Sequence, residues 1–348
     1  MNKLFIKNLS LKEVENIFNE LGEKPYRAKQ LFNWLYEKNV DSFSEMTNFS
    51  KELRKSLDEQ FAISALTLEE RQISKTDDTE KYLFKTADGN YIESVLIKND
   101  TNEKERLTIC VSSQAGCAMG CKFCRTAMIG FKRNLDTAEI LDQINHIRRI
   151  SGLINNNIVF MGMGEPFLNY DNVLKAADIM NYSFGFHISV RKITFSTCGI
   201  MNAIERFIDE KRPYNLAISL NDTLPEKRII NMPVEKKFPI SGIIDLFERK
   251  FPVSRNRLTV VYIMRKDNIS NEDAKRLKKM FKYSRIKLNL IPLNPGEHHL
   301  DVPAEEEMKE FIRELEIINV PVSVRKSFGT DIDGACGQLS GKKTSMPM

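Results

Sequence analysis

Four of the six cysteines in this 348-residue chain lie within the stretch CVSSQAGCAMGCKFC at positions 110–124. Three of them, Cys117, Cys121 and Cys124, follow the spacing CxxxCxxC, and Cys110 lies seven residues upstream. In a reducing compartment, clustered cysteines bind metal or react more often than they form structural disulfides. A zinc site with Cys110 as its fourth ligand is one interpretation, although structural zinc sites usually pair two CxxC turns and the sequence has only one.

An iron–sulfur cluster is the interpretation that the spacing favours. Three thiolates bind three irons of a 4Fe–4S cluster and leave the fourth iron open. The amino and carboxylate groups of S-adenosylmethionine can chelate an open iron, and electron transfer into the sulfonium then yields a 5′-deoxyadenosyl radical. We therefore predict that Cys117, Cys121 and Cys124 hold a 4Fe–4S cluster and that S-adenosylmethionine is the second cofactor.

Six strand-like runs, each followed by a loop or an amphipathic stretch, must position this loop. They are LTICV, NIVFM, KITFS, NLAISL, RLTVVYIM and KLNLIPL, between residues 107 and 293. The alternation predicts an α/β fold, an open six-unit (β/α) partial barrel, to which residues 320–327 can add a last strand. Sites in such folds form at the C-terminal ends of the strands, and the cysteine loop follows the first strand.

The first hundred residues have a different pattern. Stretches 10–22, 26–39 and 50–61 are amphipathic or capped like helices, and residues 82–97 are typical of a hairpin turning at Asp88-Gly89. We expect three parts: an accessory domain of helices plus hairpin over residues 1–98, the partial barrel over 99–334, and a C-terminal segment over 335–348.

Composition indicates a soluble globular protein, with 42% apolar and 28% charged residues. The net charge of +5 is compatible with a nucleic-acid partner but does not single one out. No apolar run approaches the roughly 18 residues of a membrane span, and the N-terminus lacks the apolar region of a signal peptide. We expect a cytoplasmic monomer with no membrane association.

The cysteine loop at the opening of a partial barrel identifies the chain as a member of the radical S-adenosylmethionine superfamily. Further motifs follow later strands: FMGMGEP at 160–166, STCGI at 196–200, AISLN at 217–221, LIPLNPG at 290–296 and CGQLSG at 336–341. From about Glu93 to Leu339 this set resembles the dual-specificity RNA adenine carbon-2 methyltransferases (RlmN type). The N-terminal helices are similar to the accessory domain of that family.

The resemblance implies a substrate, adenine in large-subunit rRNA and also in tRNA, and a mechanism that uses two S-adenosylmethionine molecules per turnover. Cys336 matches the position methylated by the first molecule. The second gives the radical that removes hydrogen from this S-methyl group, and the resulting carbon radical adds to adenine. Cys110 matches the thiol that then attacks the sulfur of Cys336 and releases the product as a transient disulfide forms. Glu93 matches the proton acceptor.

The same resemblance implies the cofactor contacts and the partners. The expected contacts with S-adenosylmethionine come from Gly164, Glu165, Ser196, Ser219, Leu220, Asn221 and Asn294. The chain departs from the family at Asn221, where histidine is usual, and at Arg125, after the cluster loop. Cys198 has no required role and is interpreted as a small loop residue. An electron donor for the cluster and a disulfide reductant are implied as partners.

Several interpretations stay open at the level of sequence. From the pattern alone, Cys110 can be a small buried strand residue and Glu93 a charge on an edge strand. Lys122, Arg125, Lys132 and Arg133 surround the loop and are expected to be a solvated face or phosphate contacts. The competing functions are the sister activity at adenine carbon 8 and, in another class, a non-catalytic iron–sulfur RNA-binding protein, which needs neither Cys110 nor Cys336.

Overall fold

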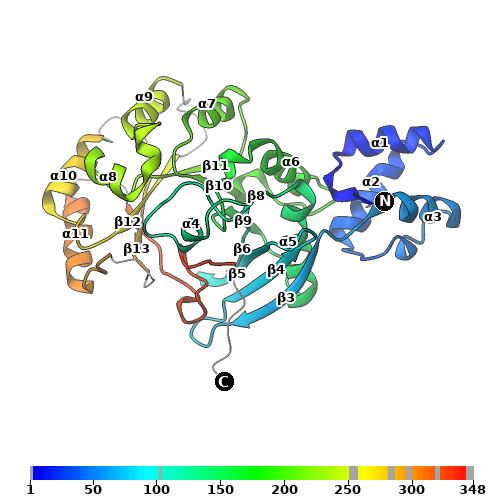
Figure 1. The fold of residues 1–348 in the computed structure, drawn as a ribbon, viewed down its shortest axis with the longest axis horizontal. Helices are drawn as coiled ribbons and strands as arrows, with labels where there is room; N and C mark the ends of the chain where they lie inside the picture. The colour runs from blue at the N-terminus through cyan, green and yellow to red at the C-terminus, as the bar shows by residue number, and fades with distance from the viewer. Residues whose placement is uncertain are drawn as a thin grey trace.

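The structure, a computed structural model, describes residues 3–101, 104–250, 258–280, 287–294, 300–317 and 322–341. Figure 1 shows a curved sheet with helices packed around it and a group of N-terminal helices at one end. None of the helices in these ranges combines the length and the apolar composition that a membrane span requires.

A ten-stranded sheet forms the centre of the described chain, in the order β14-β13-β12-β11-β10-β9-β6-β5-β4-β3. From β6 to β14 all neighbouring strands are parallel, whereas β3, β4, β5 and β6 pair antiparallel. The strands of this sheet are β3 (Leu66–Ile73), β4 (Glu80–Thr86), β5 (Tyr91–Thr101), β6 (Lys104–Cys110), β9 (Asn157–Phe160), β10 (Ile193–Thr197), β11 (Asn215–Ser219), β12 (Leu258–Met264), β13 (Lys287–Pro292) and β14 (Val322–Val324). The predicted α/β partial barrel is confirmed, including the additional last strand.

Helices lie between the parallel strands and also form the N-terminal group. They are α1 (Leu11–Glu20), α2 (Tyr26–Phe32), α3 (Lys51–Gln60), α4 (Arg125–Ile129), α5 (Thr137–Ser151), α6 (Tyr170–Asn181), α7 (Met201–Asp209), α8 (Pro225–Asn231), α9 (Ile240–Lys250), α10 (Asn271–Met280) and α11 (Glu305–Ile317). Two short pairs complete the strands, β1 (Leu4–Phe5) with β2 (Phe61–Ala62), and β7 (Gln114–Ala115) with β8 (Arg133–Asn134).

The N-terminal helices begin where the sequence predicts. Ser10 caps α1 in a reciprocal capping box with Glu13, and the hydroxyl of Ser50 accepts the N–H of Leu53 at the start of α3. The stretch 26–39 differs from the prediction of one helix, because α2 continues into a wider π-helical turn over Asn33–Glu37.

The predicted hairpin is β4 and β5, turning at Gly89 with φ +85°. It does not stand apart from the barrel, because β5 pairs with β6 and extends the same sheet. The division of the chain at residues 98 and 335 stays a prediction, and its first boundary falls inside β5. Alternation along a hairpin does not show which other strand its free edge will pair with, so the sequence left this connection open.

The strand register shows which residues share each face of the sheet. Cys110 of β6, Ser196 of β10 and Ser219 of β11 share one face, because pairing and alternation link them across β9. This inner face carries a small separate apolar cluster of Ala217, Val261 and Ile291, with Met161 packed against it. The opposite face belongs to the main core, where Phe160 stacks on Phe195 with ring centroids 4.6 Å apart.

A buried ion pair joins the N-terminal segment to the barrel. Lys7 donates to the carboxylate of Asp142 on α5, and both side chains are 1% exposed. The same carboxylate accepts the N–H of Ala65, just before β3. Asp142 therefore holds two separate N-terminal stretches against α5.

We expect Lys7→Met to destabilise the docking of the N-terminal helices by about 3 kcal/mol, because it leaves a buried carboxylate without its cation. Urea unfolding followed by the fluorescence of Trp34, the single tryptophan, measures this directly. Lys3→Met is the matched control, since the Lys3–Asp58 pair is exposed on both sides. Equal, small effects of the two variants would contradict the role given to the buried pair.

Candidate active site

The cysteine loop lies between β7 and α4, beyond the C-terminal end of β6. Backbone hydrogen bonds fix it on two sides: the N–H of Lys122 donates to the carbonyl of Asn231 (3.0 Å), and the N–H of Cys117 to that of Gly130 (3.3 Å). Gly116 has φ +74°, and a Cβ there would lie 1.8 Å from the carbonyl oxygen of Gly130. Glycine is therefore required at position 116 for the loop to close against Gly130 at the end of α4.

The three loop thiols lie close enough to influence one another. Burial raises the pKa of Cys117 to about 12 and that of Cys121 well above its usual range, and each is raised further by the neighbouring thiols. Burial also raises the pKa of Cys124, while the N–H groups of Ala127 and Thr126 at the start of α4 act against it. Backbone N–H groups directed at a sulfur stabilise a thiolate ligand.

This donor set fits a 4Fe–4S cluster. Three thiols come from one loop, and each can bind a different iron of a cubane, which does not require them to converge on one point. In the described chain no three His, Cys, Asp or Glu side chains surround a single position for one ion. Cys110, the fourth ligand of the zinc interpretation, faces Cys336 instead.

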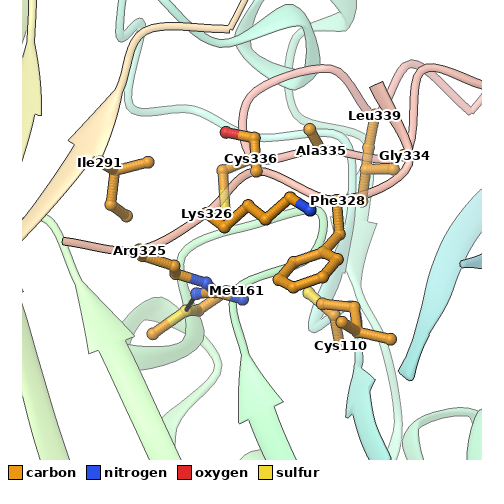
Figure 2. Close-up of a pocket in the computed structure, with 12 residues that line it drawn as sticks. Cys110, Met161, Ile291, Arg325, Lys326, Phe328, Gly334, Ala335, Cys336 and Leu339 are labelled. Atoms are coloured by element: carbon orange, nitrogen blue, oxygen red, sulfur yellow. Dashed lines mark hydrogen bonds between the residues drawn. The ribbon is translucent and has the colours of Figure 1, made fainter. Parts of the chain in front are cut away.

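Cys336 lies near both Cys110 and Cys124 of the cluster loop. Cys110 and Cys336 line one pocket (Figure 2), together with Met161, Arg325 and Phe328. Burial raises the pKa of Cys110 to about 12, and the thiol of Cys336 raises it further. The same thiol also raises the pKa of Cys124. One sulfur on the C-terminal segment is thus near both a cluster ligand and a buried thiol at the end of β6.

Hydrogen bonds from several elements hold the segment that carries Cys336. Asn294 donates to the carbonyl of Cys336 (3.0 Å), and the N–H of Arg125 donates to that of Gly337 (2.8 Å). Thr126 Oγ1 donates to the carbonyl of Leu339 (2.8 Å). Gly337 has φ +84°, and a Cβ there would approach the carbonyl oxygen of Phe123 to 2.7 Å. In Figure 1 this segment, coloured red, crosses the sheet beside α4 and β5.

Glu93 lies on β5, which is an interior strand between β4 and β6, so the edge-strand interpretation is wrong. Its side chain is 1% exposed and lies 3.4 Å from the Lys81 ammonium. The other carboxylate oxygen accepts the N–H groups of Ser340 (2.6 Å) and Gly341 (2.9 Å). These contacts connect the carboxylate to the segment that carries Cys336.

The expected cofactor contacts separate into two groups. Ser196 and Ser219 are half-buried on the inner face. Leu220 and Asn221 are buried, and the side chain of Asn221 is used within the protein: its oxygen accepts the N–H of Ile263 (2.9 Å) and its amide reaches Met232 Sδ (3.3 Å). The structure therefore gives Asn221 a supporting role between β11 and β12.

The segment with Gly164 and Glu165 packs against β7. Gly164 has φ +100°, and a Cβ would lie 2.5 Å from that of Gln114, so close packing alone requires this glycine. Glu165 is buried, which raises its pKa, and its carboxylate accepts the N–H groups of Phe167 (3.0 Å) and Cys198 (2.8 Å). The side chains of Thr197 and Cys198 also hydrogen-bond this carboxylate, so its oxygens are already well supplied with donors inside the protein.

Cys198 is closer to the site than the sequence indicated. Burial raises the pKa of its thiol, and the next contributions come from Glu165 and from Cys121. Its carbonyl accepts a hydrogen bond from the buried Arg228 (2.8 Å). The position of STCGI after the third strand was the available signal, but nothing in the sequence distinguished this cysteine from an ordinary loop residue.

Two of the four basic residues around the loop are already paired. Arg125 forms an ion pair with Asp333 (2.8 Å), so it helps to hold the C-terminal segment. Arg133 binds Asp88 (2.6 Å) and Glu139 (2.7 Å). Both guanidinium groups therefore already have a carboxylate partner inside the protein, and their role as phosphate contacts stays a prediction. Lys122 and Lys132 are exposed.

An open parallel barrel with a three-thiol loop at its first strand end defines a radical S-adenosylmethionine protein, and family models agree. Residues 111–277 match the model of the radical SAM superfamily, and residues 5–63 match that of the ribosomal RNA large subunit methyltransferase N-terminal domain. A radical SAM protein uses a 4Fe–4S cluster and S-adenosylmethionine, and the residues of this loop fit that use.

Similar proteins extend the match over the whole chain. The dual-specificity RNA methyltransferase RlmN of Geobacter sulfurreducens is 43% identical over 97% of this chain and 92% of its own length. The protein of the same name from Geotalea uraniireducens is 42% identical over 98% of each chain. A solved radical SAM methyltransferase from Sphaerobacter thermophilus superposes with a TM-score of 0.91 at 34% identity, over 97% of this chain and 100% of that one. The chain belongs to the RlmN family of dual-specificity RNA methyltransferases.

We expect anaerobically prepared protein to contain about four iron and four sulfide per chain. Replacing Cys117, Cys121 and Cys124 together by Ala removes every loop ligand, so it should abolish the iron content and the brown colour. Cys198→Ser is the matched control: it changes a thiol beside the loop that is not a ligand, and should keep the iron. Stoichiometric zinc without iron after anaerobic reconstitution would refute the cluster assignment.

Proposed function

We propose that this chain methylates carbon 2 of a specific adenosine in large-subunit rRNA and in tRNA, with Cys336 as the methyl carrier. The single observation that supports this most directly is the position of the Cys336 thiol, which influences both Cys110 and the cluster ligand Cys124. A carrier must meet the cofactor at one time and the resolving thiol at another. A non-catalytic iron–sulfur protein has no use for this arrangement.

Carbon 2 of adenine carries no lone pair, so it cannot displace a methyl group from S-adenosylmethionine. The cluster and S-adenosylmethionine supply a carbon-centred radical when both are bound. Cys336 first receives a methyl group on sulfur and then forms the methylene link to the adenine ring. These two steps leave a thioether between protein and RNA, and its bond between sulfur and the methylene carbon has to be broken to release the product.

Cys110 breaks this link. Its thiolate attacks the sulfur of Cys336, so that a sulfur–sulfur bond forms as the sulfur–carbon bond breaks. The electron pair of the broken bond goes to the former methylene carbon, which takes up a proton and becomes the methyl group of the product. The enzyme is left with a Cys110–Cys336 disulfide, and an external thiol reductant has to restore both thiols before the next turnover.

Glu93 is proposed as the acceptor of the proton from carbon 2, and the unpaired electron that radical addition leaves on the ring would be taken up by the cluster when it is bound. Lys81 and the N–H groups of Ser340 and Gly341 support this role, because they fix the position of the two carboxylate oxygens beside the segment that carries Cys336. The contacts to residues 340 and 341 also link the base to the segment that carries the methyl group. Movement of that segment would then expose the carboxylate when RNA is bound.

Around this centre we propose binding roles on the inner face. Ser196 and Ser219 contact S-adenosylmethionine, the carboxylate of Glu165 accepts from its ammonium group, and Gly164 allows the close approach. Asn294 positions Cys336 through its carbonyl. Asn221 and Leu220 support these contacts from the buried side of β11.

We propose that the N-terminal helices contact structured RNA and that the target base is flipped out to reach the buried thiols. Exposed Lys122 and Lys132 are available for phosphate beside the cluster loop. The protein acts as a cytoplasmic monomer, and a low-potential electron donor reduces the cluster. Nucleoside mass spectrometry of rRNA and tRNA from a deletion strain tests the base position and the substrate together. Loss of an adenine methyl at carbon 8 instead of carbon 2 would assign the sister activity.

We expect Cys336 to be isolated already methylated, because the first transfer needs no RNA. Peptide mass spectrometry of the segment containing ACGQL should find one added methyl group, and the triple cysteine variant should lack it, because the donor S-adenosylmethionine is held at the cluster. Fully active, cluster-loaded enzyme with unmodified Cys336 would exclude the carrier role.

Cys110→Ala should leave cluster assembly and Cys336 methylation intact and stop the reaction after the bond to RNA forms. The variant should therefore accumulate protein covalently linked to RNA, seen as a slow, nuclease-sensitive band on a denaturing gel. The double variant Cys110→Ala/Cys336→Ala should show no such band. Release of methylated adenine by the single variant at the wild-type rate would mean that Cys110 is only a buried strand residue.

A further inference from the structure

Two cations, Arg325 and Lys326, line the pocket of Cys110 and Cys336, and neither forms an ion pair with a carboxylate in the described part of the chain. Arg325 follows β14, and its backbone N–H donates to the carbonyl of Leu290 (2.8 Å), which fixes it at the C-terminal end of the last strand. No Asp or Glu in the described ranges forms an ion pair with its guanidinium. Instead Nη1 reaches Met161 Sδ at 3.3 Å (Figure 2). A thioether is a weak acceptor, so the charge of this side chain remains available for an anion.

The thiols are the groups in this pocket that can become anions. Cys110 lies at the end of β6, and the backbone of Met161 donates to its sulfur. The same methionine therefore contacts the thiol through its backbone and the guanidinium through its side chain. This arrangement places Arg325 beside the sulfur that has to attack.

The charged and titratable neighbours of Cys110 come from three elements. Arg325 follows β14, and Cys336 lies on the C-terminal segment. Lys326 also lines the pocket, but its ammonium lies over the ring of Phe328, 5.7 Å from the centroid. On β5, the carboxylate of Glu93 is directed to Lys81 and to the C-terminal segment. Of these groups, Arg325 is the one whose charge lowers the pKa of Cys110.

Resolution of the RNA link needs a thiolate, and burial works against it. With a pKa of about 12, on the order of one Cys110 thiol in 10⁵ is ionised at pH 7. The neighbouring thiol of Cys336 is one cause of the raised pKa of Cys110, and this contribution requires a sulfur that can become an anion. Once Cys336 is a thioether to RNA, that opposing contribution disappears and the favourable charge of Arg325 remains. Burial still opposes ionisation at that stage, and Arg325 together with the backbone N–H of Met161 supplies the contributions that favour the thiolate.

We infer that Arg325 is the positioning residue that stabilises the Cys110 thiolate as it attacks the sulfur of Cys336. The inference rests on the proposed function and deepens one step of it. Arg325 does not take part in the bonds that form and break. It acts on the fraction of Cys110 that is nucleophilic, and so on the lifetime of the covalent link to RNA.

The test follows the covalent protein–RNA species during a single turnover of reconstituted enzyme, on denaturing gels and over a range of pH. In Arg325→Met the species should form at the wild-type rate and decay at least tenfold more slowly at neutral pH. Removing a cation raises the pKa of the thiol, so the thiolate fraction falls at fixed pH. The decay rate should therefore recover by about tenfold for each unit by which the pH is raised.

Two further variants separate charge from shape. Arg325→Lys keeps a cation and should restore most of the decay rate. Lys326→Met removes the neighbouring cation of the same pocket and should decay like the wild type. Iron content and methylation of Cys336, neither of which needs RNA, show whether each variant is folded and loaded.

A second measurement needs no RNA. Alkylation of Cys110 by iodoacetamide, followed by peptide mass spectrometry in enzyme with methylated Cys336, should require a higher pH in Arg325→Met than in the wild type. An unchanged pH profile together with wild-type decay would overturn the inference. So would weaker RNA binding with a smaller salt dependence and no accumulated species, because Arg325 would then be a phosphate contact. If Cys110→Ala itself forms no covalent species, that result contradicts the proposed function as a whole. It is distinct from the results above, which concern only the role of Arg325.

Discussion

The packing of the C-terminal segment across the ends of the parallel strands is the constraint on which the site depends. Parallel strands all finish at one edge, so the loops after β6, β9, β10 and β11 open there together. The segment is held at that edge because Thr126 and Asn294 donate hydrogen bonds to its carbonyls and Glu93 accepts one from the N–H of Ser340. These contacts bring Cys336 beside both the cluster loop and Cys110. Without them the thiol of Cys336 would have no defined neighbours.

Burial of the site at this edge has two opposite effects on the chemistry proposed for it. Excluding water protects a radical and a covalent intermediate from side reactions. The same burial raises the pKa values of Cys110, Cys117 and Cys121, so the thiols resist ionisation. The chain offsets this locally: backbone N–H groups are directed at the loop sulfurs, and a guanidinium lies near Cys110. These neighbours partly offset the effect of burial on the thiols that they contact.

Most of the fold could be predicted because hydrophobic periodicity reports directly on strands and helices. All six predicted barrel strands occur, and Ser10 and Ser50 cap the helices that they were expected to cap. Two features could not be read in this way. The hairpin joins the barrel sheet through β5, and the stretch 26–39 changes to a π-helical turn, since both depend on contacts with distant parts of the chain.

The sequence by itself determined the class of chemistry: CxxxCxxC after a first strand implied the cluster. The resemblance of the motifs around Cys110 and Cys336 to the family led to the proposal of a resolving thiol and a carrier. The tertiary structure decided which side chains are neighbours. In the folded chain Arg125 and Arg133 form ion pairs with carboxylates, and the side chain of Asn221 bonds to β12. Cys198 and Arg325 lie at the site. The physical reason is that ligand spacing is local along the chain, whereas the charge and burial around a thiol come from residues that only folding brings together.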